Sequence, residues 1–160
     1  PREITLTSCG TEADNWVLEG VADKLKEKGQ HIITSKIEHH AILHTCEYLE
    51  KHGFEVTYLD VDSEGFVKPE VLEDAIRDDT ILISIMMVNN EIGTVEPIKE
   101  LAAVAKKHKI YFHTDSTRTR SSSCFCHQAS VARAPCLHLS GRRRHGLYRN
   151  CREYPRIEPR

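Results

Sequence analysis

The chain has 160 residues, 39% of them hydrophobic, and a formal net charge of −2, which is enough for one domain with a buried core. Its longest apolar run, residues 81–88 with Ser84 inside it, is far too short to span a membrane, and no cationic start leads into an apolar stretch as in a signal peptide. We therefore expect neither a membrane partner nor secretion.

Apolar periodicity predicts strands that alternate with helices. In chain order the pattern gives a strand at 3–8, a helix at 11–28, a strand at 31–34, a helix at 41–52, a strand at 54–59, a helix at 69–77, a strand at 80–88, a helix at 97–108 and a strand at 110–113. The apolar face of the first helix comprises Trp16, Val17, Gly20, Val21 and Leu25. This alternation indicates an α/β fold, in which helices flank a parallel sheet with right-handed crossovers.

The first loop of interest follows the first predicted strand, because ligands of parallel α/β sheets bind outside the carboxyl ends of the strands. In "TSCGTEADN", residues 7–15, Gly10 permits a tight approach and a helix starts near Thr11. Backbone N–H groups, the helix dipole and a hydroxyl would then form an anion site. The alternative is an ordinary capped helix start. The glycine spacing of Walker and dinucleotide-binding loops is absent.

Two further loops at this edge carry side chains suited to a flat ring. His39 and His40 lie at a strand-to-helix turn, where a histidine can stack on a ring or carry a proton near neutral pH; the alternative is two exposed residues that open a helix. Asn89 and Asn90 follow the most apolar strand, and an amide offers a phenolate oxygen both a donor and an acceptor; the alternative is a simple turn. Neither loop has the ligand spacing of a zinc site.

Asp115 follows the last predicted strand. An acid at the end of an interior strand is costly to bury unless a cation accompanies it, and a protonated pyridine nitrogen would be such a cation. The alternative is a capping or loop acid. An anion site, a stacking histidine, an amide and an acid at one sheet edge are together what pyridoxal phosphate requires from a protein.

Four stretches resemble a known family over about residues 3–115. They are "TSCGTEADN", "HIITSKIEHHAILHTCEYLEKHGFEVTYLDVD", "RDDTILISIMMVNNEIGTVEPI" and "HTD". The sequence is similar to the cysteine desulfurases, the NifS-like branch of the class V aminotransferases. The resemblance implies a truncated large domain of the pyridoxal-phosphate-dependent fold type I, which is aspartate aminotransferase-like.

The resemblance also implies a role for each site residue. Gly10 and Thr11 match the positions that bind the cofactor phosphate, and His39 matches the histidine that stacks on the pyridine ring and assists proton transfer. Asn90 matches the amide that faces the ring hydroxyl. Asp115 matches the acid that keeps the ring nitrogen protonated, so that the ring is an electron sink.

The activity that the resemblance implies is removal of sulfur from L-cysteine with pyridoxal phosphate as cofactor. A mobile cysteine of such an enzyme takes the sulfur as a persulfide, and alanine is released. The sulfur passes to acceptor or scaffold proteins for iron–sulfur cluster assembly or for thiolation of transfer RNA, and the parent enzyme is expected to be a homodimer. The alternatives are another class V enzyme, such as a selenocysteine lyase, and a non-catalytic α/β binding or dimerisation module.

The sequence departs from the family pattern after Asp115. Arg118 stands where the family has a Gln, and "SGRR" at 140–143 is the nearest match to the Ser-Gly-His-Lys motif that carries the Schiff-base lysine. Arginine is a poor imine former because its guanidinium stays protonated, and no lysine follows Lys109. We therefore expect this chain to bind the cofactor without a covalent bond at best, and to be inactive alone.

Composition also changes at residue 116. Residues 1–115 have ten Lys and two Arg against 22 acidic residues, a balance of −10, whereas residues 116–160 have no Lys, ten Arg and two Glu, a balance of +8. We expect residues 1–115 to be a partial cofactor-binding domain and residues 116–160 to be an Arg- and Cys-rich tail that is disordered or arises from a reading-frame error or a degraded gene. The reading-frame hypothesis fails if no other frame past codon 116 encodes Ser-Gly-His-Lys.

Two weaker alternatives concern the tail, namely zinc binding and nucleic-acid binding. The candidate zinc ligands are Cys124, Cys126, His127, Cys136 and His138, and the basic cluster is 142–144. The ligand spacing is irregular and the arginines lack interleaved aromatic residues, so we expect no metal and no nucleic acid.

Cysteine usage bears on location. Cys9 and Cys46 are the only cysteines of the first segment, as is typical of a reducing compartment, so we expect the cytoplasm. Both are interpreted as structural, since the sulfur-accepting cysteine of the family lies in a segment that this chain lacks. The opening on Pro1, with a strand almost at once, suggests a missing beginning.

Overall fold

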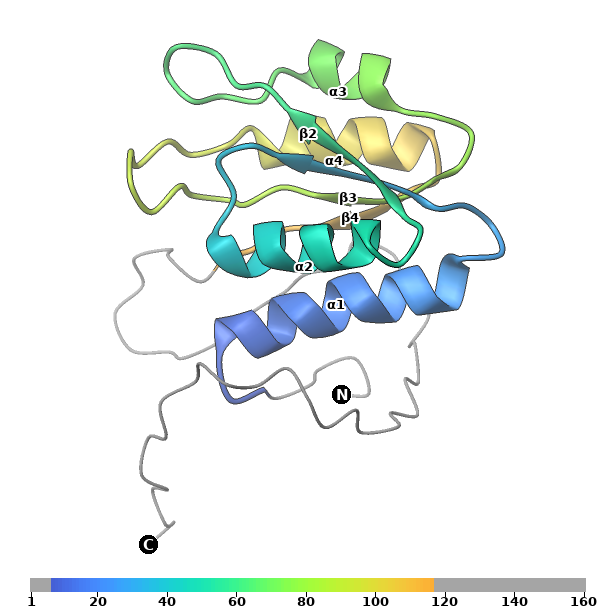
Figure 1. Ribbon diagram of the computed structural model, residues 1–160. Helices are drawn as coiled ribbons and strands as arrows, with labels where there is room; N and C mark the ends of the chain where they lie inside the picture. Colours follow the sequence, from blue (N-terminus) through green and yellow to red (C-terminus); the bar gives the residue numbers. More distant parts are fainter. Residues whose placement is uncertain (1–6, 117–160) are drawn as a thin grey trace, which may run out of the picture.

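Four parallel strands form one sheet in the computed structural model, which describes residues 7–116 (Figure 1). The strands are β1 (His31–Ser35), β2 (Glu55–Leu59), β3 (Thr80–Ser84) and β4 (Tyr111–His113), and the helices are α1 (Gly10–Leu25), α2 (His40–Glu50), α3 (Pro69–Ala75) and α4 (Ile98–Lys107). The strand order is β2-β1-β3-β4, and each neighbouring pair is parallel. The predicted α/β fold with a parallel sheet flanked by helices is confirmed.

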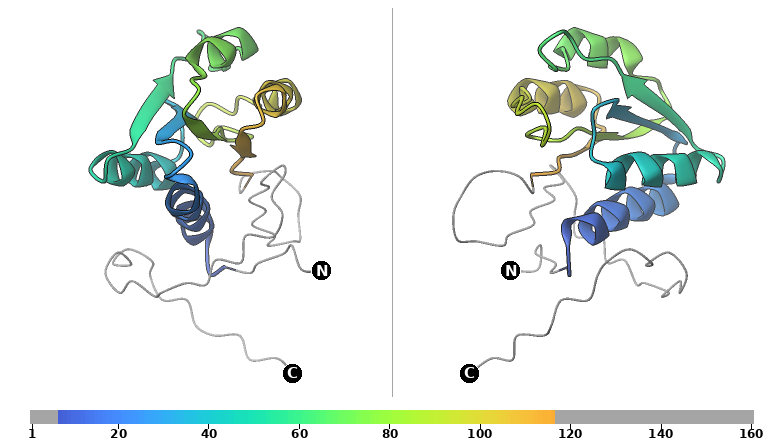
Figure 2. Two further views of the ribbon diagram at one scale, coloured as in Figure 1. Left: turned by 90° about the vertical axis from the view of Figure 1, so that its right-hand side faces the viewer. Right: turned by 60° about the vertical axis from the view of Figure 1, so that its left-hand side comes forward.

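The helices cover both faces of the sheet, with α1 and α2 on one face and α3 and α4 on the other (Figures 1 and 2). Strands β1 and β3 are buried along their whole length, as is expected for central strands of a parallel sheet that is covered on both faces. Because side chains of a strand alternate between faces, Ile32 and Leu82 pack towards α1 and α2, whereas Ile33 and Ile83 pack towards α3 and α4.

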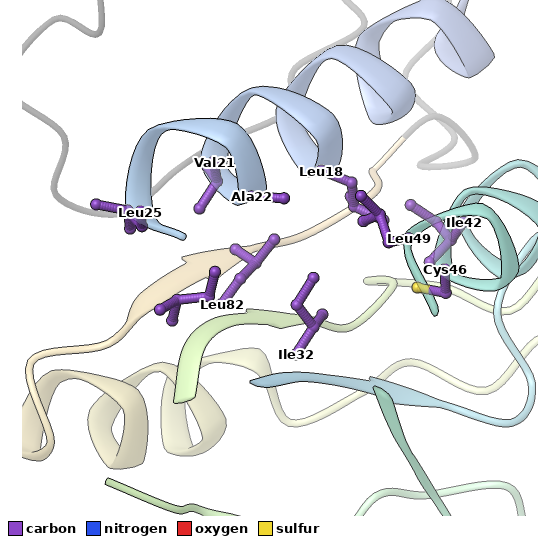
Figure 3. Packing of buried hydrophobic residues seen from close by; sticks show 10 residues of the cluster. Leu18, Val21, Ala22, Leu25, Ile32, Ile42, Cys46, Leu49 and Leu82 are labelled. Carbon is purple, nitrogen blue, oxygen red and sulfur yellow. The ribbon is translucent and has the colours of Figure 1, made fainter. Parts of the chain in front are cut away.

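The core therefore consists of two clusters, one on each face. Figure 3 shows the first, which joins α1 and α2 to β1 and β3. Its buried members are Leu18, Val21, Ala22, Leu25, Ile32, Ile42, Cys46, Leu49, Ile81 and Leu82. The second comprises Ile33, Leu59, Val67, Leu72, Ile83, Ile85, Leu101, Ala105 and Phe112. A close backbone approach supports the first layer, since a Cβ on Gly29 would lie 2.1 Å from the carbonyl oxygen of Asp79.

The apolar face predicted for α1 is wrong at one residue. Trp16 is 41% exposed, because the buried stripe of the helix runs instead through Ala13, Leu18, Val21 and Leu25. A charged residue, Asp14, lies on that buried stripe.

The strand predicted over residues 80–88 ends at Ser84. On the β4 side the pairing continues, since Ile85 N–H donates to His113 O and Met87 N–H donates to Asp115 O. On the β1 side the strand ends at Ser35, and the carboxyl group of Glu38 accepts the Met86 N–H instead. Val88 forms an antiparallel bridge to Val95, so the apolar run leaves the sheet as a hairpin-like loop.

Some predictions fall outside the described residues. They are most of the strand at 3–8 and the whole tail from 117 onwards, including Arg118, the "SGRR" stretch at 140–143 and the candidate zinc ligands. Within residues 7–116, no helix has the length and apolar character needed to cross a membrane.

Candidate functional site

The predicted site residues belong to four segments that meet at the carboxyl edge of the sheet. Strands β1, β3 and β4 are neighbours and parallel, so the loops that follow them emerge side by side. Helix α1 begins at the same edge, on the left of Figure 1, as do α2 and the loop between β3 and α4.

The start of α1 leaves its first turn without a side-chain cap. The N-cap residue is Cys9, which makes no side-chain capping bond, and Gly10 and Thr11 are the first helical residues. Glu12 turns back out of the helix, and its Oε2 accepts from Ser8 N–H at 2.7 Å and Ser8 Oγ–H at 2.6 Å. These bonds lower the pKa of Glu12. Thr11 lies within the helix and is not its N-cap, although Glu12 bonds to Ser8 at the helix start. The N–H groups of a first helical turn are suited to an anion.

His39 is half-buried and is the N-cap of α2. Its Nδ1 accepts the Ala41 N–H at 3.2 Å, so the ring proton of the neutral imidazole resides on Nε2. His40, the next residue, is exposed and stacks on His44 with ring centroids 5.6 Å apart. The two histidines therefore differ, and only His39 has its ring orientation fixed by a bond to the backbone.

Asn89 and Asn90 also differ. Asn89 is 5% exposed, and its Nδ2 donates to Ile37 O at 2.8 Å. Its Oδ1 accepts from the N–H groups of Glu91 and Ile92 at 2.8 and 3.0 Å. Asn89 thus shapes the loop, whereas the side chain of Asn90 is exposed at the edge of the sheet.

Asp115 lies just beyond β4 and is 7% exposed. Its main-chain carbonyl accepts the Met87 N–H at 2.8 Å, which ties the end of β4 to the β3–α4 loop. Asp14 of α1 faces it, and burial together with the Asp115 carboxylate raises the pKa of Asp14 to about 8. Burial lowers the pKa of His113, which lies beside them, to about 4.

Glu38 is a further buried acid that the sequence analysis did not single out. It is 6% exposed, and its Oε1 accepts from Ser35 Oγ–H at 2.7 Å and Met86 N–H at 2.9 Å. Burial raises its pKa to about 8, and the nearby carboxylates of Asp115 and Glu96 add to the rise. The only signal in the sequence is its place directly before His39, which does not reveal burial.

The structure thus brings Gly10, Thr11, His39, Asn90 and Asp115 to one edge of the sheet. Burial raises the pKa values of two neighbouring acids, Asp14 and Glu38, to about 8, which favours their neutral forms at pH 7. An edge with an open helix start on one side and a buried acid on the other suits a ligand that has an anionic group at one end and a cationic ring nitrogen at the other. The residues therefore fit pyridoxal phosphate.

The fold and the residues at the carboxyl edge of the sheet together define an α/β protein with a site for a phosphorylated ring compound. The profile of the aminotransferase class-V family matches residues 1–146, and the chain belongs to this family. Members of the family depend on pyridoxal phosphate. The profile extends past residue 115, where the resemblance was expected to stop.

Individual relatives and solved structures identify the branch of the family that this chain is similar to. The predicted resemblance to cysteine desulfurases is confirmed. Cysteine desulfurase IscS of Methanosarcina thermophila is 63% identical over 116 residues, which are 72% of this chain and 29% of that protein. A NifS-like protein of known structure is 45% identical with a TM-score of 0.72, over 74% of this chain and 33% of that one. SspA in complex with cysteine has the same identity and TM-score, over 74% of this chain and 34% of its own. The chain therefore spans about a third of the length of these relatives.

Proposed function

We propose that residues 1–115 are a partial large domain that binds pyridoxal phosphate, and that residues 116–160 are a separate tail. The likeness to cysteine desulfurases supports an origin in an enzyme that removes sulfur from L-cysteine, giving alanine and an enzyme persulfide. The cysteine in the SspA structure supports this choice of substrate class. Sulfur acceptors or iron–sulfur scaffold proteins as partners, a homodimeric parent and a cytoplasmic location belong to the same proposal.

Each of this chain's residues has one task in the proposal. The N–H groups of Gly10 and Thr11 bind the phosphate at the start of α1. His39 stacks on the ring and holds or releases a proton at Nε2, since Nδ1 is bonded to Ala41. Asn90 binds the ring oxygen, and Asp115 orients the ring through its protonated nitrogen. The cofactor, when bound, supplies an electron sink.

The observation that carries the proposal is the burial of Asp115 near the first turns of α1, whose N-cap residue Cys9 makes no side-chain capping bond. Because residues 110–160 contain no lysine, we expect non-covalent contacts alone to hold the cofactor, and we expect no turnover. The second candidate is a non-catalytic α/β binding or dimerisation module, which the same lack of lysine favours.

Titration of the full chain with pyridoxal phosphate, followed by induced circular dichroism of the cofactor band, tests the binding. Asp115→Ala and His39→Ala are expected to abolish the signal. Asp78→Asn and His44→Ala, which alter an exposed acid and an exposed histidine, are matched controls and should keep it. Equal signals from all four variants would refute the assigned site.

A second assay tests the expected lack of turnover, whereas the titration separates the two candidates. The full chain is incubated with L-cysteine and pyridoxal phosphate, and alanine is quantified by amino-acid analysis. No alanine above the level formed by free cofactor is expected, and a yield above that level would show that the chain is an active desulfurase.

A further inference from the structure

The β1–α2 loop and the β3–α4 loop are bonded to each other in both directions. Glu38, in the first loop, accepts the Met86 N–H of the second at 2.9 Å through Oε1. Asn89, in the second loop, donates from Nδ2 to the Ile37 carbonyl of the first at 2.8 Å. Each loop thus contributes one buried polar side chain that forms a hydrogen bond with the backbone of the other loop.

Each of these two side chains directly precedes a residue assigned to the ring. Glu38 precedes His39, whose ring is fixed on its other side by the Ala41 N–H. Asn89 precedes Asn90, and the Oδ1 of Asn89 holds the N–H groups of Glu91 and Ile92 beyond it. Hydrogen bonds therefore fix the chain both before and after His39, and both before and after Asn90.

We propose that Glu38 and Asn89 are positioning residues that form a reciprocal clasp between the two loops and thereby set the separation of His39 and Asn90. The assignment of His39 and Asn90 to the cofactor ring rests on the proposed function. The clasp itself rests on the bonds from Glu38 to Met86 and from Asn89 to Ile37, which are independent of any ligand.

The clasp requires a hydrogen-bond acceptor at position 38. The Oε1 of Glu38 accepts from Ser35 Oγ–H at 2.7 Å and from Met86 N–H at 2.9 Å, and a carboxyl oxygen can accept both bonds whether or not the group is ionised. The groups that face Glu38 are Asp115 beyond β4, Glu96 of the β3–α4 loop and the Cys46 thiol of α2, and none of them is a cation. A glutamine has the same shape and the same acceptor oxygen, so Glu38→Gln should keep the bonds to Ser35 and Met86.

The experiment compares amide protection by hydrogen exchange in the full chain at pH 7. In Glu38→Ala and in Asn89→Asp, which turns the donor to Ile37 into an acceptor, protection of the Met86 and Glu91 amides is expected to fall at least tenfold, because a free-energy change of about 1.4 kcal/mol corresponds to tenfold. Glu38→Gln should keep wild-type protection. Glu47→Gln, at an exposed position of α2, is the matched control.

Cofactor binding adds a readout that a merely structural role would not change. Binding of pyridoxal phosphate should weaken about tenfold in Asn89→Asp and stay unchanged in Glu38→Gln.

Unchanged Met86 protection in both Glu38→Ala and Asn89→Asp would overturn the clasp, and a Glu38→Gln chain that behaves like Glu38→Ala would show that the acceptor oxygen at position 38 does not hold the Met86 amide. If Glu38→Ala does not fold, the nearly isosteric Asn89→Asp and Glu38→Gln still decide both points. A wild-type chain that does not bind pyridoxal phosphate refutes the proposed function instead, while the exchange data still decide the clasp.

Discussion

Oδ1 of Asp14 lies 3.8 Å from the imidazole Nε2 of His113, and both side chains are buried behind Asp115. The other ring nitrogen of His113 is bonded to Ser84 Oγ at 2.9 Å. Burial lowers the pKa of the histidine to about 4, whereas burial and Asp115 raise the pKa of Asp14 to about 8. These shifts favour the neutral form of each group at pH 7 over a buried ion pair.

The stability of the fold should therefore fall as pH rises from 6.5 to 8. Asp14 and Glu38 have folded pKa values of about 8 against ordinary values of 3.8 and 4.5. In the folded state these groups keep a proton that they have lost in the unfolded chain. Their contribution to the free energy of unfolding is therefore full below about pH 4 and is lost progressively as pH rises to about 8. The lowered pKa of His113 affects stability only below its ordinary pKa of 6.5. There the unfolded chain binds a proton that the folded state does not, so stability falls as pH falls towards 4.

Thermal unfolding between pH 6.5 and 8 measures this effect. The melting temperature of the wild-type chain should decrease across the window, and Asp14→Asn should decrease less. Asp78→Asn, an exposed acid on the surface, should follow the wild type. A wild-type melting temperature that rises across the window would contradict the raised pKa values.

His39→Ala should destabilise the fold independently of any cofactor. The substitution removes the acceptor for the Ala41 N–H at the start of α2, and loss of an N-cap costs about 0.5–2 kcal/mol of unfolding free energy. His39→Asn, which can cap a helix, should recover most of this stability but not the cofactor signal. Urea unfolding, monitored by far-ultraviolet circular dichroism, measures the free energy of unfolding of each variant, with His44→Ala as the unaffected control. Equal stability of His39→Ala and wild type would contradict the cap.

Gly29→Ala should destabilise the junction between α1 and β1. The added Cβ would lie 2.1 Å from Asp79 O, which is backbone and cannot rotate away. Forced backbone shifts of this kind cost about 1–3 kcal/mol. Glu27→Ala, at an exposed position near the end of the same helix, is the control, and a wild-type melting temperature for Gly29→Ala would contradict the close approach.

Cys46 should resist alkylation in the native chain. It is fully buried in the cluster between α1, α2 and the sheet, and burial raises the pKa of its thiol to about 12. Iodoacetamide at pH 8 should label the tryptic peptide 37–51 only after unfolding in urea, because the thiolate is the reactive form. Labelling of that peptide in the native chain at the unfolded rate would show that Cys46 is accessible, against its structural interpretation.

The sequence predicted the fold well because the evidence for it is local. The short strand segments at 31–35 and 80–84, glycines after two helices and prolines near the starts of two others fix the order of elements without knowledge of distant contacts. The sheet order β2-β1-β3-β4 is known only from the structure, because parallel crossovers fix their own handedness but not which strands are neighbours.

The clasp could not be predicted, because its partners are distant in the sequence. Glu38 and Met86 are 48 positions apart, and no local pattern distinguishes a buried glutamate from an exposed one. For the same reason the end of β3 at Ser84 was missed, since it depends on where β1 ends. Of the two asparagines, only the structure shows that Asn89 holds the loop while Asn90 is exposed.

The bond between Met87 and Asp115 uses the main chain of both residues. A substitution at position 115 therefore leaves both partners of this bond in place. At position 38 the bond to the neighbouring loop comes from the side chain itself, so a substitution that removes the acceptor oxygen also removes the bond.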